Sequence, residues 1–270
     1  MIKFSYWKIG LLLGIVLFSV IMAYFISNRS ESFANKQYKY GIIICCYNRP
    51  EFLKKTLESL KQTNKNDLNQ SILYILDDHS DNKETPKMIE DYVADIKNID
   101  GVDTLKVKIN RNRENMGIAK SLEKGFTFLY PKCEYLTNID SDVLVKPNWL
   151  SKLQEVYERS NRERNDGNGV LVSGFNCTPP NCDHKILSST NLYHVKKSIG
   201  GINTFFHRDK FDDYVNVIGN NVKNWDWKLC DYCNENNIPI IVTNPSVIQH
   251  IGFTGLNSFG KEKYDYAKDF

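Results

Sequence analysis

Short apolar runs alternate with amphipathic stretches between residues 40 and 160, and this alternation constrains the fold more than any other feature of the chain. It predicts buried strands at residues 40–46, 71–76, 105–109 and 135–139, and helices at residues 51–60, 86–96, 118–129 and 149–159. Strands that alternate with helices form parallel β-α-β units, so we expect an α/β fold with a doubly wound sheet. No internal repeat is visible, and we treat residues 38–270 as one domain.

Polar side chains follow the first two predicted strands. Tyr47, Asn48 and Arg49 come directly after the first strand, and Asp77 and Asp78 come at the end of the second. In doubly wound sheets, ligands bind beyond the carboxyl ends of the strands. An aromatic ring, an amide and a cation suit the base and phosphates of a nucleotide, and a carboxylate can accept from a base N–H or a ribose hydroxyl. Asp77 and Asp78 could equally form a helix-capping turn, so these residues alone are weak evidence.

A turn containing Asn115 and Gly117 leads into the third predicted helix. Backbone N–H groups at a helix N-terminus favour an anion, and Lys120 would add a positive charge in the first turn. An ordinary Asn-x-Gly turn explains these residues about as well. The turn is therefore a candidate phosphate site only together with the other clusters.

The segment Asp140-Ser141-Asp142 follows the fourth predicted strand and is the strongest single feature. Its carboxylates place hard oxygen ligands where a divalent cation and a diphosphate can meet, and such ligands suit Mg²⁺ or Mn²⁺. A solvated loop often has the same pattern. Acidic or amide clusters at successive strand ends nevertheless favour a binding site at this edge of the sheet.

In their order along the chain, these segments resemble the family 2 glycosyltransferases. The segments are residues 46–50 (Cys-Tyr-Asn-Arg-Pro), 76–82 (Leu-Asp-Asp-His-Ser-Asp-Asn), 115–119 (Asn-Met-Gly-Ile-Ala) and 140–142 (Asp-Ser-Asp), and the resemblance covers about residues 39–155 well. It implies the GT-A fold, a Rossmann-like doubly wound mixed sheet in a single catalytic domain. It also implies that the first two clusters hold the nucleoside, and that the D-x-D segment holds metal and diphosphate. Cys45 and Cys46 replace the small residues usual in the family, which leaves the base preference open.

The second half of the chain adds a candidate base. Asp226 lies between Trp225 and Trp227, where the family commonly has Glu-Asp, and the resemblance implies that Asp226 takes the proton from the acceptor. The alternative is an N-terminal helix residue that stabilises the helix dipole. The two tryptophans are either core residues or a platform on which a sugar stacks. Gly200 and Gly201 come before this segment, and paired glycines allow backbone to approach a sugar closely.

His250 ends a final apolar segment that begins near Ile238. A lone histidine is more often structural than a ligand. GT-A enzymes, however, often supply a third metal ligand from a late histidine, and the resemblance therefore implies that His250 binds the cation with Asp140 and Asp142.

Together these features predict an inverting, metal-dependent glycosyltransferase that uses Mn²⁺ or Mg²⁺. The expected donor is a nucleotide-diphosphate sugar, with a UDP-hexose or UDP-N-acetylhexosamine favoured, and the expected acceptor is a hydroxyl of a glycan, glycoprotein or glycolipid. One alternative is a non-catalytic relative that binds glycans or nucleotide-sugars. A nucleotidyltransferase would need a Gly-rich, basic loop after the first strand, which Cys46-Tyr47-Asn48-Arg49-Pro50 does not provide. The net charge of +3 is spread along the chain and gives no reason to expect a nucleic-acid partner.

Residues 9–27 carry no charge and are bounded by Lys8 and Arg29. A helix of this length spans close to the roughly 30 Å hydrocarbon core of a membrane, so we expect a transmembrane signal anchor after a short tail at residues 1–8, with a stalk at residues 28–37. A cleaved signal peptide and a buried core helix are the alternatives. Basic residues on both sides leave the orientation open. Resemblance to type II transferases favours a lumenal catalytic domain of the ER or Golgi kind.

Cysteines bear on the same question of compartment. Cys177 and Cys182 bracket a rigid turn that could close a small disulfide if the domain is lumenal. Cys230 and Cys233 are spaced for packing on one helix face, and a zinc site made from the two pairs is a weaker alternative. Asn176 begins a glycosylation sequon, although an Asn-rich chain produces such matches by chance.

Overall fold

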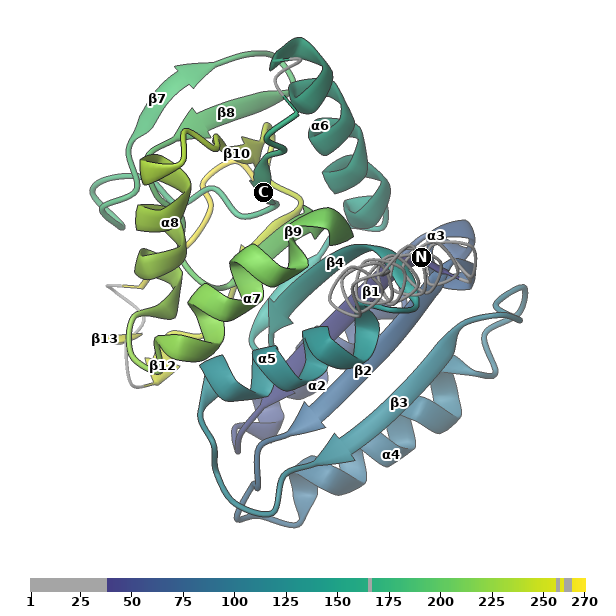
Figure 1. The fold of residues 1–270 in the computed structure, drawn as a ribbon. Helices are drawn as coiled ribbons and strands as arrows, with labels where there is room; N and C mark the ends of the chain where they lie inside the picture. Colours follow the sequence, from purple (N-terminus) through teal and green to yellow (C-terminus); the bar gives the residue numbers. More distant parts are fainter. Residues whose placement is uncertain (1–37, 165–166, 256–257, 260–263) are drawn as a thin grey trace, which may run out of the picture. The chain divides into compact units, whose positions relative to one another are not determined.

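The four apolar runs form adjacent parallel strands in the computed structural model, which describes residues 38–164, 167–255, 258–259 and 264–270 (Figure 1). These strands are β1 (Tyr38–Cys46), β2 (Ser71–Asp77), β3 (Lys106–Arg111) and β4 (Cys133–Asp140). The strands β6 (Leu171–Ser173), β7 (Ile186–Ser189), β8 (Tyr193–Lys196), β9 (Asn203–His207) and β10 (Ile240–Thr243) extend them into a nine-stranded sheet. The order is β3-β2-β1-β4-β9-β6-β10-β8-β7, and β9 runs antiparallel to β4, so the sheet is mixed.

The register aligns the carboxyl ends of the central strands. Cys46 of β1 pairs with Asp77 of β2, and Cys45 pairs with Asp140 of β4. The polar clusters that follow these strands therefore lie at one edge of the sheet.

Helices cover both faces of the sheet, as a doubly wound fold requires. The helices α2 (Pro50–Leu60), α4 (Glu84–Ile96) and α6 (Trp149–Arg164) share one apolar cluster, and α5 (Ile118–Leu129), α7 (Phe211–Asn220) and α8 (Trp225–Glu235) share another. Figure 1 shows α5 and α7 in front of the sheet and α4 behind β3. Side chains of a strand alternate between faces, so Ile42 and Ile44 of β1 enter the first cluster and Ile43 enters the second. The short helices α3 (Lys65–Asn69) and η1 (Arg208–Lys210) lie in connections.

Two small ladders complete the fold. The strand β5 (Val143–Val145) pairs with β11 (Ile248–His250), and β12 (Thr254–Gly255) pairs with β13 (Ser258–Phe259). The final apolar segment of the sequence runs from near Ile238 to His250. It divides into β10 and β11, which belong to different sheets because residues 244–247 turn the chain between them.

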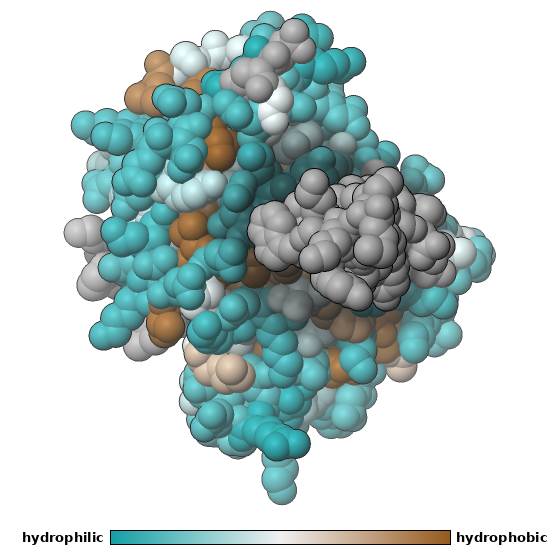
Figure 2. Space-filling view, viewed as in Figure 1, coloured by the Kyte–Doolittle hydropathy of each residue, from teal (hydrophilic) through white to brown (hydrophobic). Residues whose placement is uncertain are grey.

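The expected tail, anchor and stalk at residues 1–8, 9–27 and 28–37 lie outside the described residues. Among the residues that are described, no helix is both long and apolar enough to cross a membrane. Residues 38–270 form one compact unit. Figure 2 shows that the visible face of this unit is mainly hydrophilic, with apolar residues in small separate patches.

Candidate active site

The D-x-D segment and the last strand of the small ladder lie side by side. The β5–β11 register places His250 opposite Val143, and the Ile251 N–H donates to the Asp142 carbonyl at 2.9 Å. As a result His250 Nε2 lies 3.3 Å from Asp142 Oδ2, with both side chains buried. Two residues that are 108 positions apart thus lie together at the carboxyl edge of the sheet. We call them the donor pair, because the carboxylate oxygen and the imidazole nitrogen can each donate an electron pair to a metal ion.

A backbone carbonyl fixes the orientation of the His250 ring. Nδ1 lies 2.8 Å from the carbonyl oxygen of Asp265, which can only accept, so Nδ1 carries a proton and Nε2 is directed at Asp142. Burial alone would lower the pKa of His250, but the hydrogen bond and charge of Asp142 outweigh it and raise the pKa. Burial would raise the pKa of Asp142, yet His250 and Arg49 lower it. The pair is therefore stabilised as an imidazolium and a carboxylate.

Gly252 lies against this pair and leaves room in front of it. A Cβ atom added at Gly252 would be 1.9 Å from Asp142 Oδ2 and 2.6 Å from His250 Nε2. Only glycine therefore keeps the space beside both donor atoms free of a side chain. A carboxylate oxygen and an imidazole nitrogen that share such a space fit a divalent cation.

Asp140 is the third predicted ligand. Burial raises its pKa to about 7, and the negative charges of Asp142 and Asp226 act in the same direction. Within the described residues, no three His, Cys, Asp or Glu side chains are gathered closely enough to hold a metal ion. The structure thus brings Asp142 and His250 together and leaves Asp140 near them, because Asp140 ends β4 and a turn at residues 141–142 separates the two carboxylates.

Arg49 supplies a positive charge to the same carboxylate. Its Nη2 atom lies 2.8 Å from Asp142 Oδ2, and its guanidinium lies 4.7 Å from the centre of the Phe52 ring. Asn48 and Arg49 both have left-handed backbone, with φ of 56° and 58°, which is uncommon for residues other than glycine. This sharp bend between β1 and α2 places Arg49 at the D-x-D segment.

Tyr47 and Asn48 are bonded to the loop that follows β2. The Tyr47 hydroxyl donates to Asp81 Oδ2 at 2.9 Å, and the Asp81 N–H donates to Asn48 Oδ1 at 3.0 Å. The Asn48 N–H also donates to Ser80 Oγ at 2.8 Å. The Tyr47 ring remains 41% exposed. The loops after β1 and β2 therefore form one continuous surface that presents an aromatic ring.

Asp77 and Asp78 have partners within the protein. Asp77 accepts from the Ser80 N–H at 2.9 Å and pairs with Arg111. Asp78 accepts from the N–H groups of Met116 and Gly117, at 3.0 and 2.8 Å. Both carboxylates thus stabilise loops within the protein.

The predicted phosphate turn is bonded as an ordinary Asn-x-Gly turn. Asn115 Oδ1 accepts from the Gly117 N–H at 3.0 Å, and Gly117 has a φ of 79°. Lys120 pairs with Glu123 at 2.8 Å along α5. The anion at this helix N-terminus is the Asp78 carboxylate.

Asp226 lies beside the glycine pair. Its Oδ2 atom accepts from the Gly201 N–H at 3.1 Å, and Oδ1 accepts from the Trp227 N–H at 2.9 Å. Burial raises the pKa of Asp226, and these two N–H donors act against the rise. Trp225 is a core residue whose ring lies against Gly201, whereas Trp227 is 43% exposed. Asp226 is therefore a partly buried carboxylate close to the D-x-D segment.

Four residues of this site are not among those predicted from the sequence, and they are Asp81, Asn112, Gly252 and Asp265. Asp81 belongs to the same polar cluster as Asp77, and Gly252 comes two residues after His250, so both had a local signal. Asn112 donates to Asp78 at 2.6 Å, and Asp265 acts through its backbone carbonyl. These two could not be found because their partners are distant in sequence.

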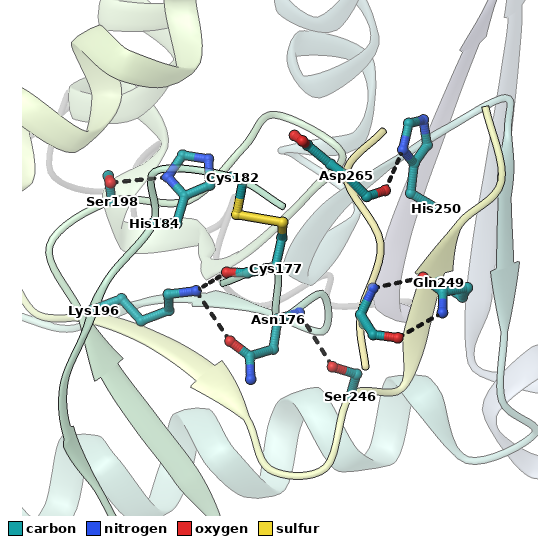
Figure 3. Close-up of a disulfide and its surroundings, with 11 residues drawn as sticks. Asn176, Cys177, Cys182, His184, Lys196, Ser198, Ser246, Gln249, His250 and Asp265 are labelled. Atoms are coloured by element: carbon teal, nitrogen blue, oxygen red, sulfur yellow. Dashed lines mark hydrogen bonds between the residues drawn. A yellow bond between two sulfur atoms is a disulfide. The ribbon is translucent and has the colours of Figure 1, made fainter. Parts of the chain in front are cut away.

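A disulfide joins Cys177 and Cys182 in a loop near this site (Figure 3). Cys230 and Cys233 are free and buried in the core, so the two pairs do not form a zinc site. Asn176, the first residue of the sequon, is buried. Its side chain accepts from Lys196 Nζ at 3.0 Å and donates to Asp269 at 3.4 Å.

Comparisons with known proteins agree on the kind of protein. An uncharacterized glycosyltransferase of Haemophilus influenzae is 25% identical over 120 residues, which are 44% of this chain and 33% of that relative. The chain thus spans about a third of the length of this curated relative.

Solved structures share the fold. GalNAc-T7 with UDP, GalNAc and Mn²⁺ superposes with a TM-score of 0.59 at 13% identity, over 83% of this chain and 45% of that one. Residues 1–349 of S. aureus TarS in complex with UDP-GlcNAc give a TM-score of 0.52 at 13% identity, over 78% and 57%. These likenesses establish the GT-A type of α/β fold. The Glycosyl transferase family 2 profile matches residues 41–208, which is more than half of the chain, and the chain therefore belongs to that family.

Proposed function

We propose that this chain is an inverting, metal-dependent glycosyltransferase that moves a sugar from a nucleotide-diphosphate donor to an acceptor hydroxyl. The observation that carries the proposal is the pairing of Asp142 with His250 beside Gly252, at the strand edge where the nucleoside clusters also lie. Family membership supports the transfer reaction, and the pair supports its dependence on a cation.

A UDP-sugar is the favoured donor. Both solved structures compared above contain UDP or UDP-GlcNAc, which supports a UDP-hexose or UDP-N-acetylhexosamine here. The exposed Tyr47 ring would stack on the base, since it lies on the surface formed by the loops after β1 and β2. Arg49 would meet the diphosphate, because it already lies at the D-x-D segment.

Asp142 and His250 would hold the cation once Nε2 of His250 gives up its proton, and Asp140, which lies near them, would bind it through water. A bound Mn²⁺ or Mg²⁺ would offset the negative charge that develops on the departing diphosphate. The Asp265 carbonyl keeps Nε2 of His250 turned toward Asp142, which is the role that outer partners of metal-binding histidines commonly have. Arg49 would exchange its contact with Asp142 for one with the diphosphate.

Asp226 would act as the general base. Its partial burial raises its pKa and brings it closer to the value that proton abstraction near neutral pH requires. The Gly201 and Trp227 N–H groups hold the carboxylate in place, so it can take the proton of the acceptor hydroxyl as the hydroxyl attacks the anomeric carbon from the face opposite the diphosphate. No covalent nucleophile is needed in this scheme.

The acceptor and the location of the enzyme are further parts of the proposal. The acceptor would be a hydroxyl of a glycan, glycoprotein or glycolipid. Residues 9–27 would anchor the chain as a type II membrane protein with a lumenal domain, which their lack of charge and the Cys177–Cys182 disulfide support.

The test measures UDP release from a panel of UDP-sugars with Mn²⁺, and again with EDTA. We expect release that depends on the cation and falls at least about 100-fold in Asp142→Asn, which keeps the shape of the side chain but loses its charge. Asp231→Asn is the matched control, because Asp231 is an exposed carboxylate on α8. UDP binding without release would instead indicate the non-catalytic relative, and release unaffected by EDTA would refute the role of the metal.

A further inference from the structure

Trp227 is a large apolar side chain exposed beside the proposed base. It directly follows Asp226, and 43% of its surface is exposed, whereas Trp225 two residues earlier is buried. An exposed tryptophan leaves a large apolar surface in contact with water, which is unfavourable unless another molecule covers it. Within a catalytic domain, such a ring is most useful where a ligand covers it.

The Trp227 ring is held in place by a histidine. The centres of the Trp227 and His184 rings are 5.2 Å apart in a tilted stack, and His184 is itself buried. His184 Nδ1 lies 2.9 Å from Ser198 Oγ, and burial lowers the pKa of His184 to about 4, so the ring is neutral at pH 7. Figure 3 shows His184 beside the disulfide loop, directed at Ser198. The indole thus rests on a fixed, uncharged surface.

The same contacts connect Trp227 to the glycine pair. His184 Nε2 would be 3.6 Å from a Cβ atom at Gly200, and the Gly201 N–H donates to Asp226 at 3.1 Å. Asp226, the glycine pair, His184 and Trp227 therefore form one continuous group. A molecule whose hydroxyl reaches Asp226 would lie next to the indole.

We propose that Trp227, supported by His184, is the platform for the acceptor, and that the acceptor is a pyranose sugar. This inference rests on the proposed function. A pyranose has a flat face of C–H groups and hydroxyls around its edge, so it can cover an indole and offer a hydroxyl to the neighbouring carboxylate at the same time. Such a ring fits a flat apolar surface with one polar group at its side.

A peptide acceptor fits this surface less well. An extended peptide needs free backbone groups to bond. The Gly201 N–H is bonded to Asp226, the Gly201 carbonyl accepts from Asn138 at 2.9 Å, and the Ile202 carbonyl accepts from the Asp140 N–H at 3.0 Å. The chain beside the base has these groups already paired.

The experiment compares acceptors and variants of the full chain. UDP release from the donor that the wild type uses would be measured with a panel of p-nitrophenyl hexosides, with a Ser/Thr-rich peptide and with no acceptor.

Trp227→Ala should raise the KM for the preferred hexoside roughly 10- to 50-fold, because the buried contact with the indole is lost. Trp227→Phe should recover part of this loss. UDP affinity should stay unchanged, because UDP binding is assigned to Tyr47, Arg49 and the cation. Val222→Ala is the control, since Val222 is an exposed apolar residue in the connection before α8.

Each outcome has a distinct meaning. A hexoside KM that is unchanged in Trp227→Ala overturns the platform. A wild type that releases UDP slowly into water, but is stimulated by no hexoside or only by the peptide, overturns the sugar acceptor while the donor reaction stands. A wild type that neither binds nor releases UDP refutes the proposed function itself, and the platform with it.

Discussion

Gly252→Ala tests the cation site without removing any donor atom. The added Cβ would be 1.9 Å from Asp142 Oδ2 and 2.6 Å from His250 Nε2, and real Cβ contacts essentially never fall below 3.0 Å. Asp142 and Gly252 must therefore separate by at least about 1.1 Å, and His250 and Gly252 by about 0.4 Å. The two donors can no longer share a cation at their present positions.

The size of the effect follows from this displacement. A misplacement of about 1 Å near reacting groups costs about 100-fold in rate. This factor corresponds to about 2.7 kcal/mol in the activation barrier. We expect the Mn²⁺-dependent part of UDP binding to weaken by a similar factor, because the same two atoms would hold the cation.

Calorimetric titration of UDP, with Mn²⁺ and with EDTA, measures the effect directly. Gly200→Ala is the matched control, because its Cβ would meet only His184 Nε2, at an ordinary contact distance of 3.6 Å. Thermal unfolding of both variants checks that they fold. A folded Gly252→Ala variant whose UDP binding still responds to Mn²⁺ as in the wild type would falsify the cation site at Asp142 and His250.

Two further predictions concern Asp226 and His184. Asp226→Asn keeps the shape of the side chain and one of its two hydrogen bonds, to the N–H of Gly201 or of Trp227, but it cannot take a proton. Transfer should therefore fall about 10²- to 10⁴-fold while UDP and Mn²⁺ affinity stay unchanged. A rate within a few-fold of wild type would show that Asp226 only caps its helix. Burial, with the charge of Lys196 adding to it, lowers the pKa of His184 from 6.5 to about 4, so the unfolded chain takes up a proton that the folded chain resists as the pH falls below 6.5. Between pH 7 and 5, urea denaturation should show the wild type losing about 2 kcal/mol more stability than His184→Asn, and equal losses would contradict the burial of a neutral His184.

The sequence predicts the central sheet well because its signals are local. The four apolar runs become β1, β2, β3 and β4 within a few residues of the expected bounds, since a run of buried residues between turn residues carries its own evidence. Parallel pairing then places the residues after β1, β2 and β4 at one edge, so the meeting of these clusters follows from the strand order alone.

Side-chain partners within the site could not be predicted in the same way. The structure bonds Asp78 to Gly117 and Arg49 to Asp142, and the sequence predicts neither partner. These partners are 39 and 93 positions away along the chain, and no local pattern selects one polar partner over another at such a distance. Asn176 also has a distant partner, because Asp269 is 93 residues later in the chain.

The β5–β11 ladder also has a consequence for how the protein folds. The parallel strands β1, β2, β3 and β4 lie within residues 38–140, whereas β11 begins at Ile248. Contacts between distant parts of a chain form slowly, because the entropy of closing the intervening loop is lost before the contact contributes any stability. Asp142 and His250 are separated by 108 positions, so they should meet late, after the central strands have paired. A ribosome that has released only the first 200 residues has already supplied every strand of the central parallel sheet, but not the histidine that completes the donor pair. Chemistry at this edge therefore becomes available only to a chain that has finished folding.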